Sequence, residues 1–344
     1  MRVFISGMGA ISSLGNSVSE MYAALKENKT HIVCNEEWKQ YKGLESYLMA
    51  EARPYNSKVI PRQIRRSMSP MSEMSVLATH QALESAGFSE HNFWEHTTAP
   101  HRTMLIMGST TGSPIVMEDH FRKLFERGGP ESMLSTAFFK IMNHSVSANV
   151  ALALGYKGPV AGTSSACSTS AQAIVQGWEL IQSGLYDVVV VGGADELHYT
   201  TPSIFNTVQA ASTTYNDRPE QASRPFDNDR DGLVVSEGAG VLVLESEDHI
   251  RRRGHKPVGE VFGGAYMSDG QHMSHPRSEV IGEVMNIALE RSSTAKEQID
   301  YVNAHATATR IGDIQEARGI YDVFGDRVPV SSLKGHFGHS LAAC

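Results

Sequence analysis

Short apolar runs that end in small residues recur along the chain and predict buried strands. Residues 188–191 are four consecutive valines followed by two glycines, as expected of a strand covered on both faces. Similar runs lie at residues 3–7, 104–108, 238–244, 301–305 and 328–332. Between them, residues 72–86 carry apolar side chains at helical spacing and stop at Gly87. Alternating strands and helices predict an α/β fold whose sheets are covered by helices.

The size and composition of the chain are those of an ordinary globular protein. Its 344 residues, 41% of them hydrophobic, suffice for one large domain or two fused halves. The net charge of −8 argues against general nucleic-acid binding. No run approaches the roughly 18 apolar residues of a membrane span, and residues 1–15 lack the pattern of a secretory leader.

The three cysteines indicate a reducing compartment. Cys34, Cys167 and Cys344 are far apart and odd in number, so they form neither a disulfide framework nor a zinc pattern. We therefore expect a cytoplasmic protein without a structural metal.

Cys167 has the setting of a reactive thiol. It lies among small and hydroxyl residues, directly before an amphipathic segment over residues 171–182. At a helix N-terminus, the unpaired N–H groups and the helix dipole favour a thiolate. A lone cysteine also fits the role of a small buried side chain, so other residues must decide.

Two histidines follow strand-like segments in loops of small residues. His305 and His339 would lie at the carboxyl ends of strands, where open α/β sheets place ligands. Two such imidazoles could donate to one oxygen or act as acid and base. Asp313 and Glu316, at i and i+3, could share a helix face. We expect an ion pair between Glu316 and Lys334 to hold the two loops together.

Motifs spread over the whole chain resemble those of the β-ketoacyl-acyl carrier protein synthases, in particular the elongating Cys-His-His type of the thiolase superfamily. They are residues 7–15, 165–169, 224–227, 230–232 and 237–240, the loop from His305 to Glu316, and Lys334 to His339. The resemblance implies a thiolase-type five-layered αβαβα fold of two similar halves. We place the halves at residues 1–246 and 247–344. It also implies a homodimer, or a heterodimer with a related synthase subunit.

Carried over residue by residue, the resemblance implies a catalytic set in this sequence. Cys167 would accept the acyl group as a thioester, which cysteine forms readily. His305 and His339 would drive malonyl decarboxylation and stabilise the enolate oxygen. Lys334 and Glu316 would orient them. The expected reaction is a decarboxylative Claisen condensation with malonyl-acyl carrier protein, which elongates fatty acyl, polyketide or polyene chains.

The resemblance also implies how substrate arrives. Thr307, Thr309 and Ser274 fall where the family contacts the phosphopantetheine arm, and Thr111 and Phe205 where it lines or gates the acyl pocket. The arm comes with the carrier protein, so no cofactor of the enzyme itself is expected. Carrier proteins are acidic, so a basic cluster would steer one to the site. That cluster is Arg62, Arg65 and Arg66.

The sequence departs from the family pattern at several positions. Ala306, Ala308 and Ser236 stand where glycine is usual, and the added methyl groups could crowd the pantetheine arm or the backbone. These differences favour a specialised pathway such as a polyketide or polyene cluster. The sequence ends at Cys344, before the closing strands and the Gly-Phe-Gly-Gly loop of the family. We therefore expect a truncated chain that is poorly soluble or weakly active alone.

Two other functions compete with the elongating synthase. A CoA-dependent thiolase would need a second active-site cysteine in a glycine-rich loop, and Cys344 has no such context. A non-catalytic chain-length-factor-like subunit would lack the nucleophile, which Cys167 argues against.

Overall fold

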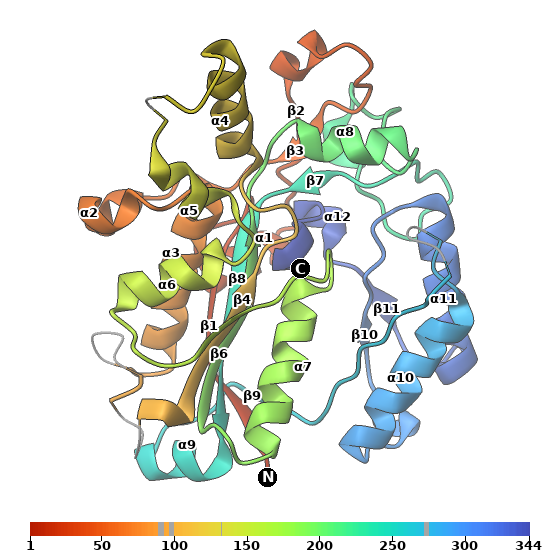
Figure 1. Cartoon of the computed structure of the whole chain (residues 1–344). Coiled ribbons are helices and arrows are strands. Elements are labelled where there is room, and N and C mark those ends of the chain that lie inside the picture. Colours follow the sequence, from red (N-terminus) through yellow and green to blue (C-terminus); the bar gives the residue numbers. More distant parts are fainter. Residues whose placement is uncertain (89–92, 96–99, 132, 272–274) are drawn as a thin grey trace.

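A mixed six-stranded sheet forms the largest layer in the described part of the computed structural model, which covers residues 1–88, 93–95, 100–131, 133–271 and 275–344 (Figure 1). Its order is β5-β4-β6-β8-β1-β9. Strands β5, β4 and β6 are parallel, whereas β8 is antiparallel to β6 and β1, and β9 is antiparallel to β1. The bounds are β1 Val3–Ile11, β4 Thr103–Gly108, β5 Val160–Gly162, β6 Val188–Asp195, β8 Gly238–Ser246 and β9 Gly259–Val261.

Helices cover both faces of this sheet. On one face α3 (Pro70–Ser85) packs against β1, β8 and β6, and α6 (Ser145–Leu154) packs against β4. On the other face α7 (Thr169–Gln182) lies over β6, β4 and β8. Every residue of β6 is buried, as the valine run predicts for a strand with two covered faces.

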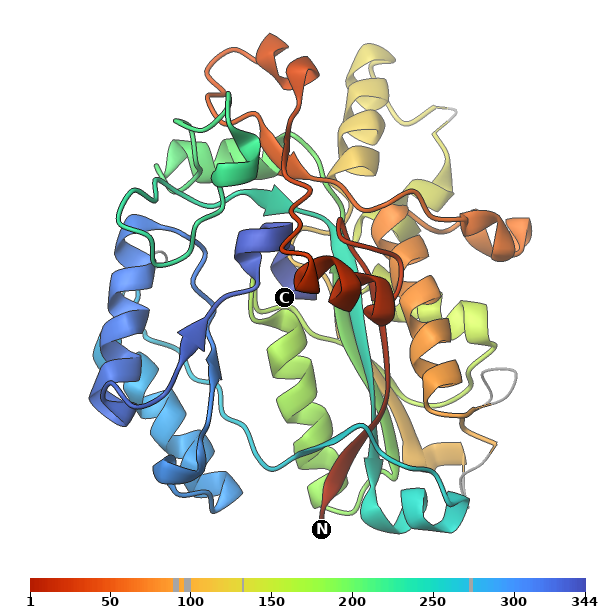
Figure 2. The same cartoon turned by 180° about the vertical axis from the view of Figure 1, so that it is seen from behind.

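The layers continue beyond α7. A parallel pair of short strands, β10 (Val302–Asn303) and β11 (Val330–Ser331), lies on the far side of α7 from the large sheet (Figures 1 and 2). Helices α10 (Ser278–Ser292) and α11 (Arg310–Phe324) pack together outside that pair. The order helix, sheet, helix, sheet, helix is the five-layered arrangement implied by the family resemblance.

A small three-stranded sheet, β2-β3-β7, lies at the end of the large sheet where β4 and β6 terminate (Figure 1). Its strands are β2 Val33–Cys34, β3 Leu48–Ala50 and β7 Val235–Ser236. The remaining helices are α1 Val18–Lys26, α2 Arg62–Arg65, α4 Pro114–Glu126, α5 Phe138–Ile141, α8 Thr200–Thr207, α9 Glu247–Arg253 and α12 Lys334–Phe337. Because β7 also contacts the segment after α12, this sheet positions part of the site.

The observed elements match the strands and helices that the apolar pattern predicts. The predicted division after residue 246 falls between β8 and α9, and β9 beyond it still pairs with β1. Where the division lies therefore stays a prediction. Among the helices of the described ranges, none is long and apolar enough to cross a membrane.

Candidate active site

Cys167 lies in a tight turn directly before α7, as its sequence setting predicts. Ala166 adopts a left-handed conformation with φ +48°, which turns the chain sharply ahead of the thiol. The Thr169 hydroxyl accepts the Ser165 N–H at 2.9 Å and donates to the Ala166 carbonyl at 2.7 Å. The Thr110 hydroxyl donates to the same carbonyl at 3.0 Å. The turn that carries the thiol is therefore held from both sides.

His339 is anchored like a strand residue although it follows a short helix. Its N–H donates to the Val234 carbonyl at 2.8 Å, and its carbonyl accepts the Ser236 N–H at 2.9 Å. The preceding Gly338 has φ +73°, and a Cβ there would lie 3.0 Å from the Val234 carbonyl oxygen. The backbone of His339 is thus fixed by the β7 segment, and His339 is 1% exposed.

His305 is positioned through its backbone by Glu316. One carboxylate oxygen of Glu316 accepts the His305 N–H, and the other accepts the Ala306 N–H, each at 2.7 Å. The ion pair expected between Glu316 and Lys334 is absent within 4.0 Å among the described residues. Two backbone donors already occupy the carboxylate, while buried Lys334 acts on the site through its charge. The predicted ion pair is therefore wrong, and Glu316 orients the His305 loop directly.

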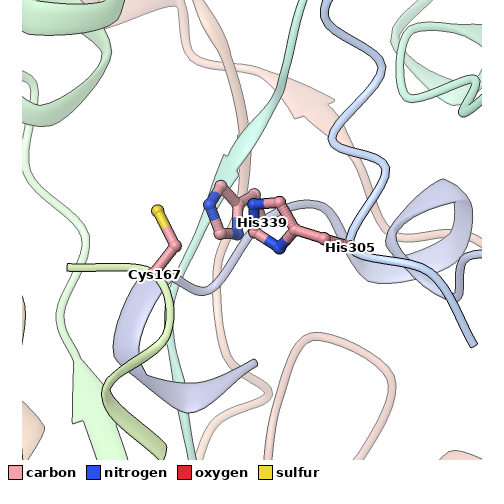
Figure 3. A group of neighbouring side chains, drawn as sticks. All are labelled: Cys167, His305 and His339. Carbon is pink, nitrogen blue, oxygen red and sulfur yellow. The ribbon is translucent and has the colours of Figure 1, made fainter. Parts of the chain in front are cut away.

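The three predicted catalytic side chains converge from separate segments of the chain (Figure 3). One ligand atom from each of Cys167, His305 and His339 lies within 4.8 Å of the other two. The imidazole rings are edge to face, with centroids 5.2 Å apart. The His339 Nε2 atom is buried and has no hydrogen-bond partner among the described residues. The sulfur and two imidazole nitrogens could also hold a soft divalent cation, because thiolate and imidazole are its preferred ligands.

Burial dominates the protonation of these groups. It raises the pKa of the Cys167 thiol to about 12, and the charge of Lys334 opposes this shift. Burial, with Lys334, lowers the pKa of His305 to about 4. It also lowers the pKa of His339 well below its usual value, and His305 and Lys334 add to that shift. The helix N-terminus was expected to favour a thiolate at Cys167, but the desolvation of the sulfur is the larger effect. An imidazole can therefore serve as the acceptor of the thiol proton.

Asp313 holds two residues in the left-handed region at once. Its carboxylate accepts the Phe226 N–H at 2.8 Å and the Ala308 N–H at 3.1 Å. Those two residues have φ +64° and +68°. Glycine would fit the Ala308 position without strain, so this departure from the family pattern acts on the backbone. Ala306 has no positive φ, and its methyl group packs into a small buried cluster.

Sequence reasoning missed Asp195, a fully buried carboxylate at the end of β6. It accepts the Ser109 hydroxyl at 2.5 Å, the N–H groups of Thr110 and Thr111 at 3.0 and 3.2 Å, and the Ala342 N–H at 2.8 Å. Burial raises its pKa, and these donors oppose the shift. Asp195 thereby ties the loop after β4 to the turn that follows His339. An acid at the end of an unbroken apolar strand was the signal for it.

The predicted substrate-binding residues fall in several places. The Thr307 hydroxyl donates to that of Thr309 at 3.3 Å, at the start of α11 and beyond His305. The Thr111 hydroxyl is 3.3 Å from the Asp195 carboxylate, beside the Cys167 turn. Phe205 on α8 packs into a different cluster, with Trp38, Leu233 and Val235. Ser274 lies outside the described residues.

Of the three arginines in the predicted basic cluster, Arg65 contacts other side chains, whereas Arg62 and Arg66 extend into solvent. Arg65 donates to the Ser57 hydroxyl at 3.2 Å and forms an ion pair with Glu73 at 3.8 Å. Arg62 and Arg66 are exposed, and neither forms an ion pair among the described residues. Val59, 62% exposed, lies close by in sequence. Two arginines with an apolar neighbour thus form the free surface.

Sequence reasoning also missed Cys344. Its Sγ lies 3.0 Å from His339 Nδ1, and the Ser340 hydroxyl lies 3.6 Å from the same sulfur. The chain therefore places a second thiol against the far nitrogen of a candidate catalytic histidine.

Comparisons with known proteins agree with this geometry. The "Beta-ketoacyl synthase, N-terminal domain" family matches residues 1–249, and the corresponding C-terminal domain family matches residues 258–344. The chain is 37% identical to the 3-oxoacyl-[acyl-carrier-protein] synthase 1 of Haemophilus influenzae, over 99% of this chain and 82% of that protein.

Solved structures give the same result. The crystal structure of a β-ketoacyl synthase from Burkholderia phymatum superposes with a TM-score of 0.94 at 37% identity, over 100% of this chain and 83% of that one. The ishigamide ketosynthase/chain length factor superposes with a TM-score of 0.88 at 27% identity, over 99% and 82%. The chain belongs to the β-ketoacyl synthase family, whose members are acyltransferases with a thiolase-type fold.

Proposed function

We propose that this protein catalyses the decarboxylative Claisen condensation of an acyl thioester with malonyl-acyl carrier protein. The observation that carries the proposal is the approach of Cys167, His305 and His339 within 4.8 Å. A nucleophile, a neutral base and hydrogen-bond donors are what such a condensation needs at one point. The arrangement of the three groups thus matches the reaction's demands.

In the first step Cys167 takes the acyl group. Its sulfur attacks the carbonyl carbon of the acyl-pantetheine thioester, while neutral His305 accepts the thiol proton. The bond from that carbon to the pantetheine sulfur breaks, and the departing sulfur takes the proton back from the imidazole. Because the Cys167 pKa is raised to about 12, the base is needed for the attack.

In the second step the malonyl thioester loses carbon dioxide. The electron pair of the broken C–C bond forms an enolate, whose oxygen accepts hydrogen bonds from the histidines. The buried, unpartnered Nε2 of His339 is suited to donate one of them. The enolate carbon attacks the Cys167 thioester, a C–C bond forms and the C–S bond breaks. His305 passes a proton taken up from solvent to the departing sulfur.

The substrates would arrive on an acyl carrier protein. Arg62 and Arg66 are exposed and form no ion pair with any described residue, and exposed Val59 lies close to them in sequence; together they provide charge and an apolar contact for an acidic partner. The hydroxyls of Thr307 and Thr309 lie beyond His305, where a phosphopantetheine arm could donate to and accept from them. These two features support delivery of both thioesters as carrier-bound groups.

A second subunit would cover an apolar surface on α4 and α5. Phe121 stacks with Phe125, and Phe138 packs on Phe139; all four are exposed, Phe125 to 75%. Strand β5, at the edge of the large sheet, contacts α6, which in turn contacts α5. Isolated exposed apolar side chains are common on protein surfaces, but a cluster of four aromatic ones is typical of a surface that a partner subunit covers. We propose a dimer, with either an identical chain or a related synthase subunit.

Two alternatives have weaker support. A non-catalytic subunit does not need a cysteine directed at two histidines. A thiolase needs its second cysteine facing the substrate, whereas Cys344 contacts His339 at Nδ1, the nitrogen other than the unpartnered Nε2. Free thiols at all three cysteines support the proposed location in the cytoplasm.

Mass spectrometry and a condensation assay test the proposed function together. Incubation with acyl-carrier protein should add one acyl group to Cys167, and malonyl-carrier protein should then yield the 3-oxoacyl product and carbon dioxide. Cys167→Ala should abolish acylation but retain decarboxylation. His339→Ala should lower decarboxylation by about 10²-fold or more, since one oxyanion donor is lost. Acylation of the Cys167→Ala variant, or no product from the unaltered protein, would refute the proposal.

A further inference from the structure

The turn after His339 brings a thiol back against the histidine ring. The Ala343 N–H donates to the Ser340 carbonyl at 3.0 Å, and the Cys344 N–H donates to the Leu341 carbonyl at 3.2 Å. Leu341 is left-handed, with φ +52°. Asp195 secures the turn by accepting the Ala342 N–H. The 3.0 Å contact between Cys344 Sγ and His339 Nδ1 therefore belongs to a defined turn.

The direction of the hydrogen bond follows from the two atoms that meet. The Cys344 Sγ atom lies 3.0 Å from His339 Nδ1. A thiol sulfur is only a weak acceptor, whereas an unprotonated imidazole nitrogen is a full acceptor, so the favoured arrangement has the Cys344 S–H donating to Nδ1. When Nδ1 accepts, the single ring proton lies on Nε2. That nitrogen is buried, has no hydrogen-bond partner in the described part of the chain and belongs to the catalytic cluster.

We infer that Cys344 is a positioning residue that fixes His339 in the Nε2–H tautomer by donating its S–H to Nδ1. The inference rests on the proposed function, because the Nε2 proton is the one that would stabilise the enolate oxygen. It assigns a task to a thiol that the acylation chemistry does not use. It also separates the two cysteines: Cys167 reacts with substrate, and Cys344 acts only through His339.

Two substitutions at Cys344 separate donation from mere space filling. Cys344→Ala removes the donor, so His339 can place its proton on either nitrogen. Condensation and decarboxylation should then fall by about tenfold or more, as when an orienting partner is lost. The fall should be in kcat, with acylation of Cys167 close to that of the unaltered protein. Cys344→Ser keeps a donor and should restore most of the rate.

The direct measurement is the tautomer itself. In protein labelled with ¹⁵N-histidine, the His339 signals are assigned by their loss in His339→Gln. Nδ1 should have the shift of an unprotonated nitrogen in the unaltered protein and in Cys344→Ser, and move towards the protonated value in Cys344→Ala. Cys34→Ala is the matched control, because it removes a thiol that contacts Glu36 instead of a catalytic histidine, and it should change neither spectrum nor rate.

The outcomes distinguish this inference from the proposed function. If Cys344→Ala keeps an unprotonated Nδ1, the inference is overturned whatever the rates are. If the tautomer changes in Cys344→Ala but the condensation rate does not, the proposed positioning role of Cys344 is overturned. If the unaltered protein forms no 3-oxoacyl product while its tautomer responds as expected, the proposed function fails and the structural inference stands. A cooperative thermal melt of each variant establishes that it is folded.

Discussion

Glu316→Gln is the most informative single substitution at the site, because the carboxylate has two backbone donors and forms no ion pair with any described residue. Both oxygens accept, one from the His305 N–H and one from the Ala306 N–H. An amide has only one oxygen, so its NH₂ group must face one of those donors. The variant keeps nearly the same volume and loses one charge-assisted hydrogen bond. We expect the His305 loop to shift and the protein to be less stable.

The size of the effect can be estimated. A hydrogen bond to a charged group contributes about 1.5–3 kcal/mol. Unfolding entropy near 60 °C is about 2.1 cal/mol/K per residue, or about 0.7 kcal/mol/K for a chain of this length. The expected fall in Tm is thus about 2–4 °C. Condensation should fall by about tenfold or more, since His305 loses its orienting partner. Acylation of Cys167 should fall too, because His305 is the base that accepts the thiol proton in that step.

Thermal melting and the two separate rates are the assays. Asp322→Asn is the matched control, because it makes the same chemical change at an exposed position of α11. A Glu316→Gln variant with the Tm and condensation rate of the Asp322→Asn variant would refute the reasoning. If a second substitution at Lys334 restored the Tm and rate of the Glu316→Gln variant, that result would support the ion pair that the sequence suggested.

Three further predictions concern docking, pH and metal binding. Charge reversal at Arg62 and Arg66 should raise KM for carrier-bound substrates and flatten its salt dependence, but leave KM for a small pantetheine thioester unchanged. Charge reversal at Arg65 should mainly lower Tm, because it breaks the contact with Glu73. Equal effects on both substrates would contradict the docking surface. Burial raises the pKa of Glu196 from 4.5 to about 7, so between these values the unfolded chain releases a proton that the folded one retains. Stability should therefore fall by up to about 3 kcal/mol as pH rises through that interval, and Glu196→Gln should flatten the slope measured by urea unfolding. Zinc ions should block acylation reversibly by occupying the three-ligand cluster, and Co²⁺ should give a thiolate charge-transfer band that Cys167→Ser removes; a band unchanged in that variant would place the metal elsewhere.

The fold could be predicted largely from the apolar pattern. Runs of β-branched residues that end in glycine are specific for buried strands, and the valines of β6 are buried along their whole length. Family motifs identified Cys167, His305 and His339, and the structure brings them together. Local spacing also placed Asp313 and Glu316 on one helix, α11.

The predictions that failed depend on the surroundings of each group in the folded protein, which local sequence does not show. Opposite charge suggested a pair between Glu316 and Lys334, but two N–H groups in a fixed loop take the carboxylate. The helix N-terminus favoured a thiolate at Cys167, but the desolvation of a buried sulfur is the larger effect. Cys344 could not be assigned because its contact depends on a turn with a left-handed leucine, for which the sequence carries no signal.

The carboxylate of Asp313 has a consequence for the modularity of this protein. It belongs to the region matched by the C-terminal domain family, yet it fixes Phe226 of the N-terminal one, and Arg230 lies 3.6 Å from it. The two regions are therefore joined by the contacts of one carboxylate with Phe226 and Arg230. Chimeras joined between residues 249 and 258 should take Asp313 and the residues it contacts from the same parent. If only one of the two regions were exchanged, the left-handed residues near His305 could lose their hydrogen-bond acceptor.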